Sequence, residues 1–241
     1  MNFVANKSDS TFNIITLVKK YGVCVVPDFI SAQNLLPLNN EFDQIIDREY
    51  GEGFYEHGCR DYMDAIAVSD NHLLRSPFSA EIELVTTPAI RKFAKKFYNK
   101  DTFYIQHIFN VKSTETPKKS SELPYSLHFD KIHMLKFFFL LSDTDEDCGP
   151  TWVVPGQQKK SFQLRKKWHN EGGSVQSINN DLHYLDNEAI PIIGTAGSLI
   201  ILDTDIPHKA GIVAKHRYRK VIRVSMTCPA YASIDLRRNS E

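Results

Sequence analysis

Three residues that can bind a metal ion occur at two places in the chain. His128 and Asp130 are separated by one residue at the end of a run, 125–129, that is typical of a strand, where residues i and i+2 point to the same face. His208 follows another apolar run, 198–203, after a short turn. Two histidines and one carboxylate form the facial arrangement that holds Fe(II) on one side and leaves three coordination positions open. We therefore predict a catalytic iron site with His128, Asp130 and His208 as ligands.

Arginine is the second chemical signal, because a dicarboxylate cosubstrate requires a planar and permanently charged partner. Three arginines, Arg217, Arg219 and Arg223, follow the last predicted ligand and are expected on one face of a strand. A strand of about 3.3 Å per residue separates Arg219 from Arg223 by about 13 Å. Only one of the three can therefore bind a given carboxylate, and the residues alone leave the choice open.

The elements that would position these residues change in character along the chain. The first hundred residues predict helices and one short strand, at 8–20, 31–46 and 88–98 for the helices and 23–26 for the strand. Residues 51–78 show no sustained period and are expected to be irregular. The second half predicts strands at 103–112, 125–129, 134–141, 151–154, 189–193, 198–203 and 220–226. Short strands after a helical region predict an antiparallel barrel or sandwich with helices packed on one side.

Length and composition support one domain. The 241 residues are predicted to form a single unit, with a helical flank over 1–100 and a β core over 101–230. The stretch 156–187 is longer than a strand connection requires, and we expect it to act as a lid over the site.

Charge and hydropathy exclude several classes of partner and location. Lys plus Arg and Asp plus Glu both total 29, so there is no basic excess for binding nucleic acid. No apolar run approaches the 20 or so residues that cross a bilayer, so we expect no membrane helix. The first residues lack the features of a signal peptide, and the four cysteines form no closely spaced pair. These observations predict a cytoplasmic protein with reduced thiols.

At this point the sequence resembles the phytanoyl-CoA dioxygenase-like branch of the Fe(II)/2-oxoglutarate oxygenases. The resemblance covers most of the chain and includes the segments 21–31 and 149–156. His128-x-Asp130, His208 and an arginine eleven positions later, Arg219, match the metal ligands and the cosubstrate arginine of the family in order and spacing. The chain departs from the family at two places: Gln157-Gln158 stands where Ser-His is common, and Ala210 stands where a hydroxyl residue is common.

The same resemblance extends to the strand before the first ligands. Gln106 and Asn110 are similar to residues that lie beside 2-oxoglutarate in the ectoine hydroxylase branch, and the resemblance implies cosubstrate binding for both. His107 alternates with Gln106 and is expected to face outward. Arg223, two residues before Ser225, resembles the arginine of other 2-oxoglutarate oxygenases and remains the alternative anchor to Arg219.

The resemblance implies a mainly β fold with a double-stranded β-helix (jelly-roll, cupin-like) core and flanking N-terminal helices. It also implies Fe(II), 2-oxoglutarate and O2 as cofactor and cosubstrates, and hydroxylation of a C–H bond with release of succinate and CO2. Asp130 argues against halogenation, because halogenating relatives lack this carboxylate. The expected substrate is a small molecule, free or bound to a carrier, and the sequence carries no signal for an oligomeric state. The alternatives are a non-oxidative metal-dependent barrel, acting as a hydrolase or isomerase, and a metal-free binding module; neither requires a buried arginine.

Overall fold

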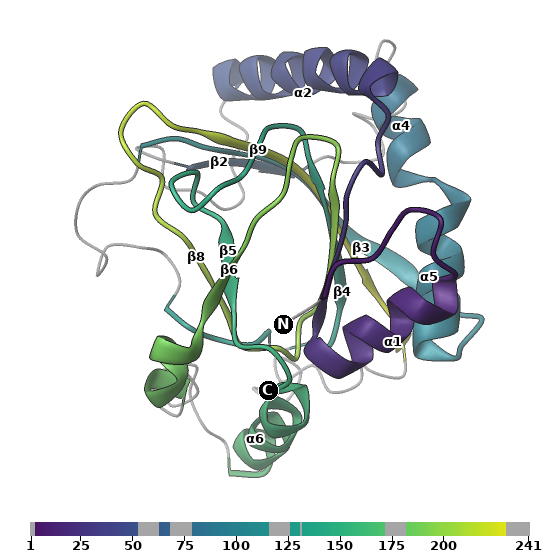
Figure 1. The fold of residues 1–241 in the computed structure, drawn as a ribbon, viewed down its shortest axis with the longest axis vertical. Helices are drawn as coiled ribbons and strands as arrows, with labels where there is room; N and C mark the ends of the chain where they lie inside the picture. Colours follow the sequence, from purple (N-terminus) through teal and green to yellow (C-terminus); the bar gives the residue numbers. More distant parts are fainter. Residues whose placement is uncertain are drawn as a thin grey trace.

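Two antiparallel β-sheets form the centre of the protein (Figure 1). The structure is a computed structural model that describes residues 3–52, 63–67, 79–115, 126–130, 132–171 and 182–229. The large sheet has the strand order β1-β7-β4-β9-β3-β2 and the small sheet the order β6-β5-β8. The strands of the large sheet are β1 (Val23–Val26), β2 (Met63–Ala67), β3 (Tyr104–Ser113), β4 (Leu135–Leu140), β7 (Leu199–Asp203) and β9 (Arg219–Thr227). Those of the small sheet are β5 (Thr151–Val153), β6 (Ile190–Ile192) and β8 (His208–Ala210).

Helices cover the outer face of the large sheet. Figure 1 shows α1 and α5 on one side of the sheet and α2 across its end. The helices are α1 (Thr11–Tyr21), α2 (Ala32–Glu52), α4 (Ser79–Val85), α5 (Pro88–Tyr98) and α6 (Gln158–Glu171), with a short 3-10 helix, η2 (His183–Glu188). None of the described helices has the length and apolar character that a membrane span requires.

The two faces of the large sheet pack against different partners, which decides where each strand residue points. Ile222 on β9 belongs to an apolar cluster with residues of α1, α2 and α5, so it faces the helices. Its neighbour Val221 belongs to a second cluster that includes Val153 and Ile192 of the small sheet, so it faces the space between the sheets. Side chains alternate along a strand. Arg219, Arg223 and the other odd-numbered residues of β9 therefore point toward the interior.

The end of α1 contacts the segment that leads to His208. Ser10 caps the start of α1, because its side chain accepts a hydrogen bond from Asn13 N, and the helix ends at Gly22 with φ +80°. Gly22 O accepts a hydrogen bond from Asp203 N at 2.8 Å. A Cβ atom on Gly22 would lie 2.7 Å from Cδ1 of Ile206, so glycine is required here both for the positive φ and for the close approach.

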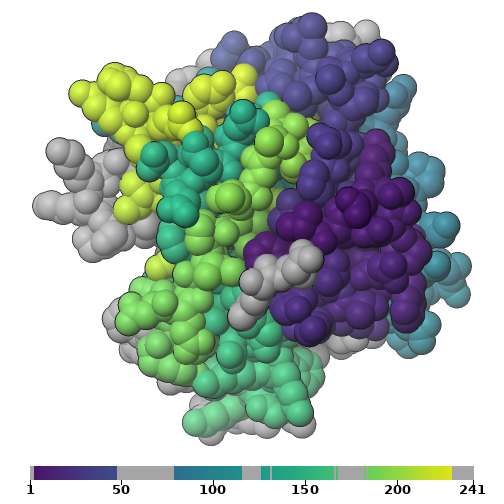
Figure 2. Space-filling model, in the orientation of Figure 1, coloured from purple at the N-terminus to yellow at the C-terminus, as the bar shows by residue number. Residues whose placement is uncertain are grey.

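Helix α6 packs on the outer side of the small sheet. Leu164 of α6 and Trp152 are partly buried and pack against a buried cluster that contains Val154 and Leu185. Figure 2 shows α6 and the neighbouring segment near η2 as a lobe at the lower end of the molecule. Part of the lid predicted over 156–187, residues 172–181, lies outside the described residues. The lid therefore stays a prediction.

The predicted fold class is confirmed, and most predicted elements lie within two residues of the observed ones. The other expectations about elements need correction. The region 51–78 contains β2 and was not irregular throughout, and β8, α4, α6 and η2 were not predicted. No strand forms over the described part of 125–129, where His128 makes only an isolated bridge to His208. Helix α2 extends to Glu52, beyond its predicted end at 46.

Candidate metal centre

Backbone hydrogen bonds join the two segments that carry the predicted ligands. His128 N donates to His208 O at 3.0 Å, and His208 N donates to His128 O at 2.7 Å. Asp130 N donates to Thr204 O at 3.2 Å. The H-x-D segment is therefore paired with the turn between β7 and β8, and this pairing fixes the distance between the two histidines.

The three predicted ligands converge on one point. Asp130 Oδ1 lies 3.8 Å from His128 Nε2 and 3.6 Å from His208 Nε2, and the two imidazole centroids are 4.5 Å apart. One ligand atom from each residue lies within 4.8 Å of the other two. Bonds of about 2.0–2.2 Å to nitrogen and oxygen allow a single ion to contact all three atoms. The residues fit a metal ion that prefers imidazole and carboxylate ligands.

The imidazole rings present the correct nitrogen to such an ion. His128 Nδ1 lies 2.7 Å from Ser126 O, and His208 Nδ1 lies 2.9 Å from Ile206 O. A backbone carbonyl can only accept a hydrogen bond, so Nδ1 carries the proton and Nε2 keeps a lone pair. His208 Nε2 is buried and has no hydrogen-bond partner. A buried nitrogen without a hydrogen-bond partner is what a metal-binding atom looks like when no metal is bound.

Both histidines are held neutral, as metal ligation requires. Burial, together with the nearby His128 and Lys136, lowers the pKa of His208 to about 3, against the opposing effect of Asp130. Burial also lowers the pKa of His128, against the opposing effect of Asp130. The two imidazoles can therefore bind a cation across the neutral range without first releasing a proton.

Lys136 contacts the carboxylate of Asp130 on the side away from the histidines. Its Nζ lies 2.6 Å from Asp130 Oδ2, whereas Oδ1 faces the two imidazoles. Burial would raise the pKa of Asp130, but Lys136, His208 and His128 together hold it below its ordinary value. Lys136 stands opposite Ser225 in the register of β4 with β9, and thus on the interior face. Sequence analysis missed this residue, because it lies within an apolar run.

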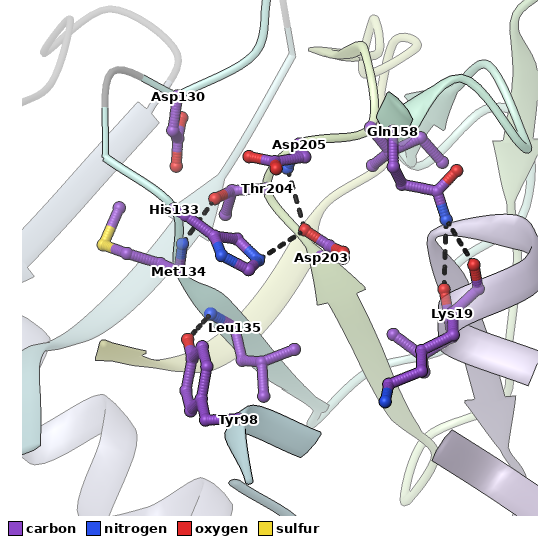
Figure 3. A network of polar contacts seen from close by, with 12 residues as sticks. Lys19, Tyr98, Asp130, His133, Met134, Leu135, Gln158, Asp203, Thr204 and Asp205 are labelled. Carbon is purple, nitrogen blue, oxygen red and sulfur yellow. Dashed lines mark hydrogen bonds and ion pairs between the residues drawn. The ribbon is translucent and has the colours of Figure 1, made fainter. Parts of the chain in front are cut away.

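His133, Asp203 and Asp205 form a second group of metal-capable side chains (Figure 3). His133 Nε2 is 3.0 Å from Asp203 Oδ1, and this oxygen also accepts a hydrogen bond from Asp205 N. Asp205 Oδ1 is paired with Arg165 Nη2 at 2.5 Å. His133 and Asp205 already have these ionic partners. We therefore interpret the group as a structural network next to the metal centre and not as a second metal site.

The structure separates the three candidate arginines. Arg217 precedes β9, is exposed and forms an ion pair with Asp145, so the expectation that it shares the strand face was wrong. Arg219 and Arg223 do share the interior face, and the guanidinium of Arg223 lies 4.6 Å from the centroid of the Phe109 ring. Burial and the neighbouring Arg223 lower the pKa of Arg219 to about 10, so it remains a cation at neutral pH. Its Nε atom is buried without an acceptor. A carboxylate would complete this environment.

Gln106 and Asn110, the two β3 residues expected beside the cosubstrate, have different surroundings. Asn110 pairs with Ile222 and therefore faces the helices, where its Nδ2 donates to Glu81 Oε2 at 3.1 Å. The structure does not bring Asn110 near Arg219, and we leave it out of the cosubstrate residues. Gln106 occupies a β-bulge, and its buried Oε1 has no hydrogen-bond partner. The bulge reverses the alternation, so His107 stands opposite Ser225 in the register with β9. Its side chain is nevertheless exposed, as expected.

The departure from the family pattern at Gln157-Gln158 has a structural explanation. Gln158 begins α6, and its side-chain amide donates to the carbonyl of Val18 at 3.1 Å and to that of Lys19 at 3.4 Å (Figure 3). These carbonyls lie in the last turn of α1, where few backbone amides remain to bind them, and that of Val18 also accepts a hydrogen bond from Gly22 N at 2.7 Å. Gln158 thus fastens α6 to α1.

Several solved structures share this fold. The epimerase SnoN from nogalamycin biosynthesis, in complex with Fe3+, alpha ketoglutarate and nogalamycin RO, has a TM-score of 0.67 at 16% identity, covering 90% of this chain and 83% of that one. The carbocyclase SnoK from the same biosynthesis has a TM-score of 0.68 at 15% identity, covering 91% and 84%. AviO1 from Streptomyces viridochromogenes Tue57 has a TM-score of 0.60 at 15% identity, covering 92% and 96%. At these identities the likeness concerns the fold.

A comparison with curated protein sequences gives no significant match. The family comparison is informative over most of the chain. The model of the family described as phytanoyl-CoA dioxygenase (PhyH) matches residues 18–221, a stretch that contains both metal-ligand segments and Arg219. This match confirms the resemblance, and the chain belongs to the PhyH family, whose members depend on Fe(II) and 2-oxoglutarate.

Proposed function

We propose that this protein is an oxygenase that hydroxylates an unactivated C–H bond of a small metabolite, with release of succinate and CO2. His128, Asp130 and His208 hold the iron, and Arg219 binds the distal carboxylate of 2-oxoglutarate. The convergence of two neutral Nε2 atoms and one carboxylate oxygen carries the proposal, because it provides three ligands on one side of an ion. Bound Fe(II) and 2-oxoglutarate supply the oxidising chemistry of the family.

The protein's own groups would orient the reactants. The Nδ1 contacts of both histidines to backbone carbonyls keep the rings in place. Lys136 occupies Oδ2 of Asp130 and leaves Oδ1 to face the metal. The buried guanidinium of Arg219 supplies the positive charge for a dicarboxylate, and a hydrolase, an isomerase or a metal-free binding barrel would have no need of it. This cation favours a 2-oxoglutarate enzyme over the non-oxidative alternatives.

Outcomes other than hydroxylation depend on how the substrate is positioned and not on the metal ligands. SnoN and SnoK are named as an epimerase and a carbocyclase, and both act in the biosynthesis of a small molecule. Their fold likeness supports a small-molecule substrate here. The buried, free cysteines Cys24, Cys148 and Cys228 suit a reducing compartment, and we place the enzyme in the cytoplasm.

The test replaces one metal ligand and measures both Fe(II) binding and succinate release. Replacing Asp130→Ala removes the only carboxylate of the site, so Fe(II) binding should weaken strongly and substrate-dependent succinate release should stop. The measurement is anaerobic Fe(II) titration, followed by a screen of metabolite pools for succinate release and for a product 16 mass units heavier than its substrate. Iron affinity and turnover like those of the wild type in the Asp130→Ala protein would contradict the ligand assignment. A product of unchanged mass would indicate epimerisation instead of hydroxylation. A product lighter by two hydrogens would indicate ring formation or desaturation.

A further inference from the structure

Arg165 of helix α6 is a buried arginine that contacts both metal-ligand segments. Its side chain is only 3% exposed. Nε and Nη2 donate to the backbone carbonyl of Asp130 at 3.1 Å and 2.8 Å. The same Nη2 atom pairs with Asp205 Oδ1 at 2.5 Å. One guanidinium thus joins a predicted ligand in the first segment to the turn that leads to His208 in the second.

The planar shape of the guanidinium matters for this contact. Two of its N–H groups converge on one carbonyl while the group also reaches a carboxylate, and its face lies 5.2 Å from the centroid of the Phe129 ring. A lysine ammonium has the same charge, but it lacks the fixed fork that makes these contacts at the same time. The position therefore requires arginine specifically and not simply a positive charge.

Helix α6 is held in place by contacts of its own, so the backbone that carries Arg165 has a fixed position. Gln158, two turns earlier, binds the last carbonyls of α1, and Leu164 packs into the apolar cluster outside the small sheet. The guanidinium consequently reaches the ligand segments from a helix that is held independently of them. Movement of either segment away from the other would break a contact to a buried charge.

We propose that Arg165 is a positioning residue for the metal centre: it fixes the backbone of Asp130 relative to the 204–208 turn and thereby sets the distance between the ligands. The inference rests on the proposed function for the identity of the metal, and it assigns a role in the site to helix α6, which contributes no ligand. Residues that orient metal ligands in this way typically change metal affinity by about 10- to 100-fold when they are replaced.

The experiment compares metal affinity with stability in matched variants. Arg165→Met keeps an unbranched apolar stem but removes all three hydrogen bonds, and it should raise the dissociation constant for Fe(II) by about 10- to 100-fold. Arg165→Lys keeps the charge and should recover only part of the affinity. Lys159→Met, at an exposed position of the same helix, is the control and should bind Fe(II) like the wild type. Affinities are measured without oxygen and well below the melting temperature, with the absorption spectrum of bound Co(II) as a probe of geometry.

A merely structural role would lower the melting temperature and leave the Fe(II) affinity and the Co(II) spectrum of the folded protein unchanged, and this result would overturn the proposal. If Arg165→Met does not fold, Arg165→Lys and Asp205→Asn decide: wild-type affinity and spectrum in both would equally overturn it. The failure of the proposed function is distinguishable, because then wild-type protein would show no Fe(II) binding that depends on Asp130. A loss of affinity confined to the Arg165 and Asp205 variants supports the positioning role.

Discussion

Arg219 is a cation in the interior whose Nε lacks an acceptor, and its charge predicts a specific defect when it is removed. Truncating one partner of a buried, hydrogen-bonded charge pair costs about 2–5 kcal/mol. Arg219→Ala should therefore weaken 2-oxoglutarate binding by roughly 30- to several-thousand-fold. Fe(II) binding should remain nearly intact, because no metal ligand is altered. Titration of the Fe(II)-loaded protein with 2-oxoglutarate, followed by the charge-transfer band in the absence of oxygen, measures both quantities.

Arg223 provides the matched control for this prediction. It lies on the same interior face, four residues along β9, and its guanidinium packs over the Phe109 ring. Arg223→Ala should affect 2-oxoglutarate binding much less than Arg219→Ala. The reverse ranking would move the cosubstrate anchor to Arg223, and wild-type binding in both variants would remove the main argument for a 2-oxoglutarate enzyme.

Replacing Lys136 should change the affinity for 2-oxoglutarate without lowering the affinity for Fe(II). Because its Nζ occupies Asp130 Oδ2, the carboxylate has one oxygen left for the metal. In Lys136→Met, the released oxygen can also turn toward the metal and compete for a coordination position. We expect 2-oxoglutarate to bind at least several-fold more weakly and Fe(II) to bind as well as before or better, since a nearby positive charge is lost. A parallel loss of both affinities, measured by the same titrations, would contradict this role.

At the scale of single elements, the prediction from sequence failed where a strand departs from strict alternation. The apolar pattern of β3 predicted the strand itself, but the bulge at Gln106 places His107 opposite Ser225, where unbroken alternation would not put it, while its side chain stays exposed. A bulge adds one residue without a clear change in composition, so periodicity cannot locate it. The same limit explains the missing strand at His128, because a pair of residues with alternating character also fits an extended loop that pairs through one bridge.

Helix α4 carries a buried carboxyl group that should make stability depend on pH. Burial raises the pKa of Glu81 from 4.5 to about 7, although the hydrogen bond from Asn110 opposes the shift, and the nearby Glu41 increases it. The folded state thus binds a proton more tightly than the unfolded state does. As the pH rises from about 4.5 to 7, Glu81 should reduce the free energy of unfolding, and above pH 7 this loss is complete. The loss amounts to about 3 kcal/mol at most.

Glu81→Gln tests this prediction, because the amide has a similar shape and does not ionise. Urea unfolding at several values between pH 5 and pH 8 should show the variant gaining stability over the wild type as the pH rises. Comparison of the two proteins removes the contribution of histidines, which titrate in the same range. A constant difference across this range would show that Glu81 is already ionised in the folded protein at pH 5.

At the scale of the whole molecule, local patterns of apolar strands and of rare side chains predicted an antiparallel β core and the convergence of the three ligands, and the family resemblance added the jelly-roll topology. It did not predict the residues that reach the site through tertiary contacts. Arg165 stands in a basic run with Lys166 and Lys167 that is typical of a solvated surface, yet it is buried. Asn110 was assigned to the wrong face of its strand for a related reason. Which face lies toward the helices depends on tertiary packing, and Asn110 contacts Glu81 of α4 on that face.

The backbone pairing of His128 with His208 also has a consequence for folding. The two residues are 80 positions apart, and closing a flexible loop of that size costs about 4 kcal/mol by the logarithmic rule for chain entropy. Strand pairing between β4 and β7 closes most of this loop before any metal arrives, so the metal need not supply that cost. A metal that binds only the folded chain must then stabilise it by mass action. Excess Mn(II) should raise the melting temperature of the wild type and leave that of Asp130→Ala unchanged, whereas equal shifts would mean that the ion binds elsewhere.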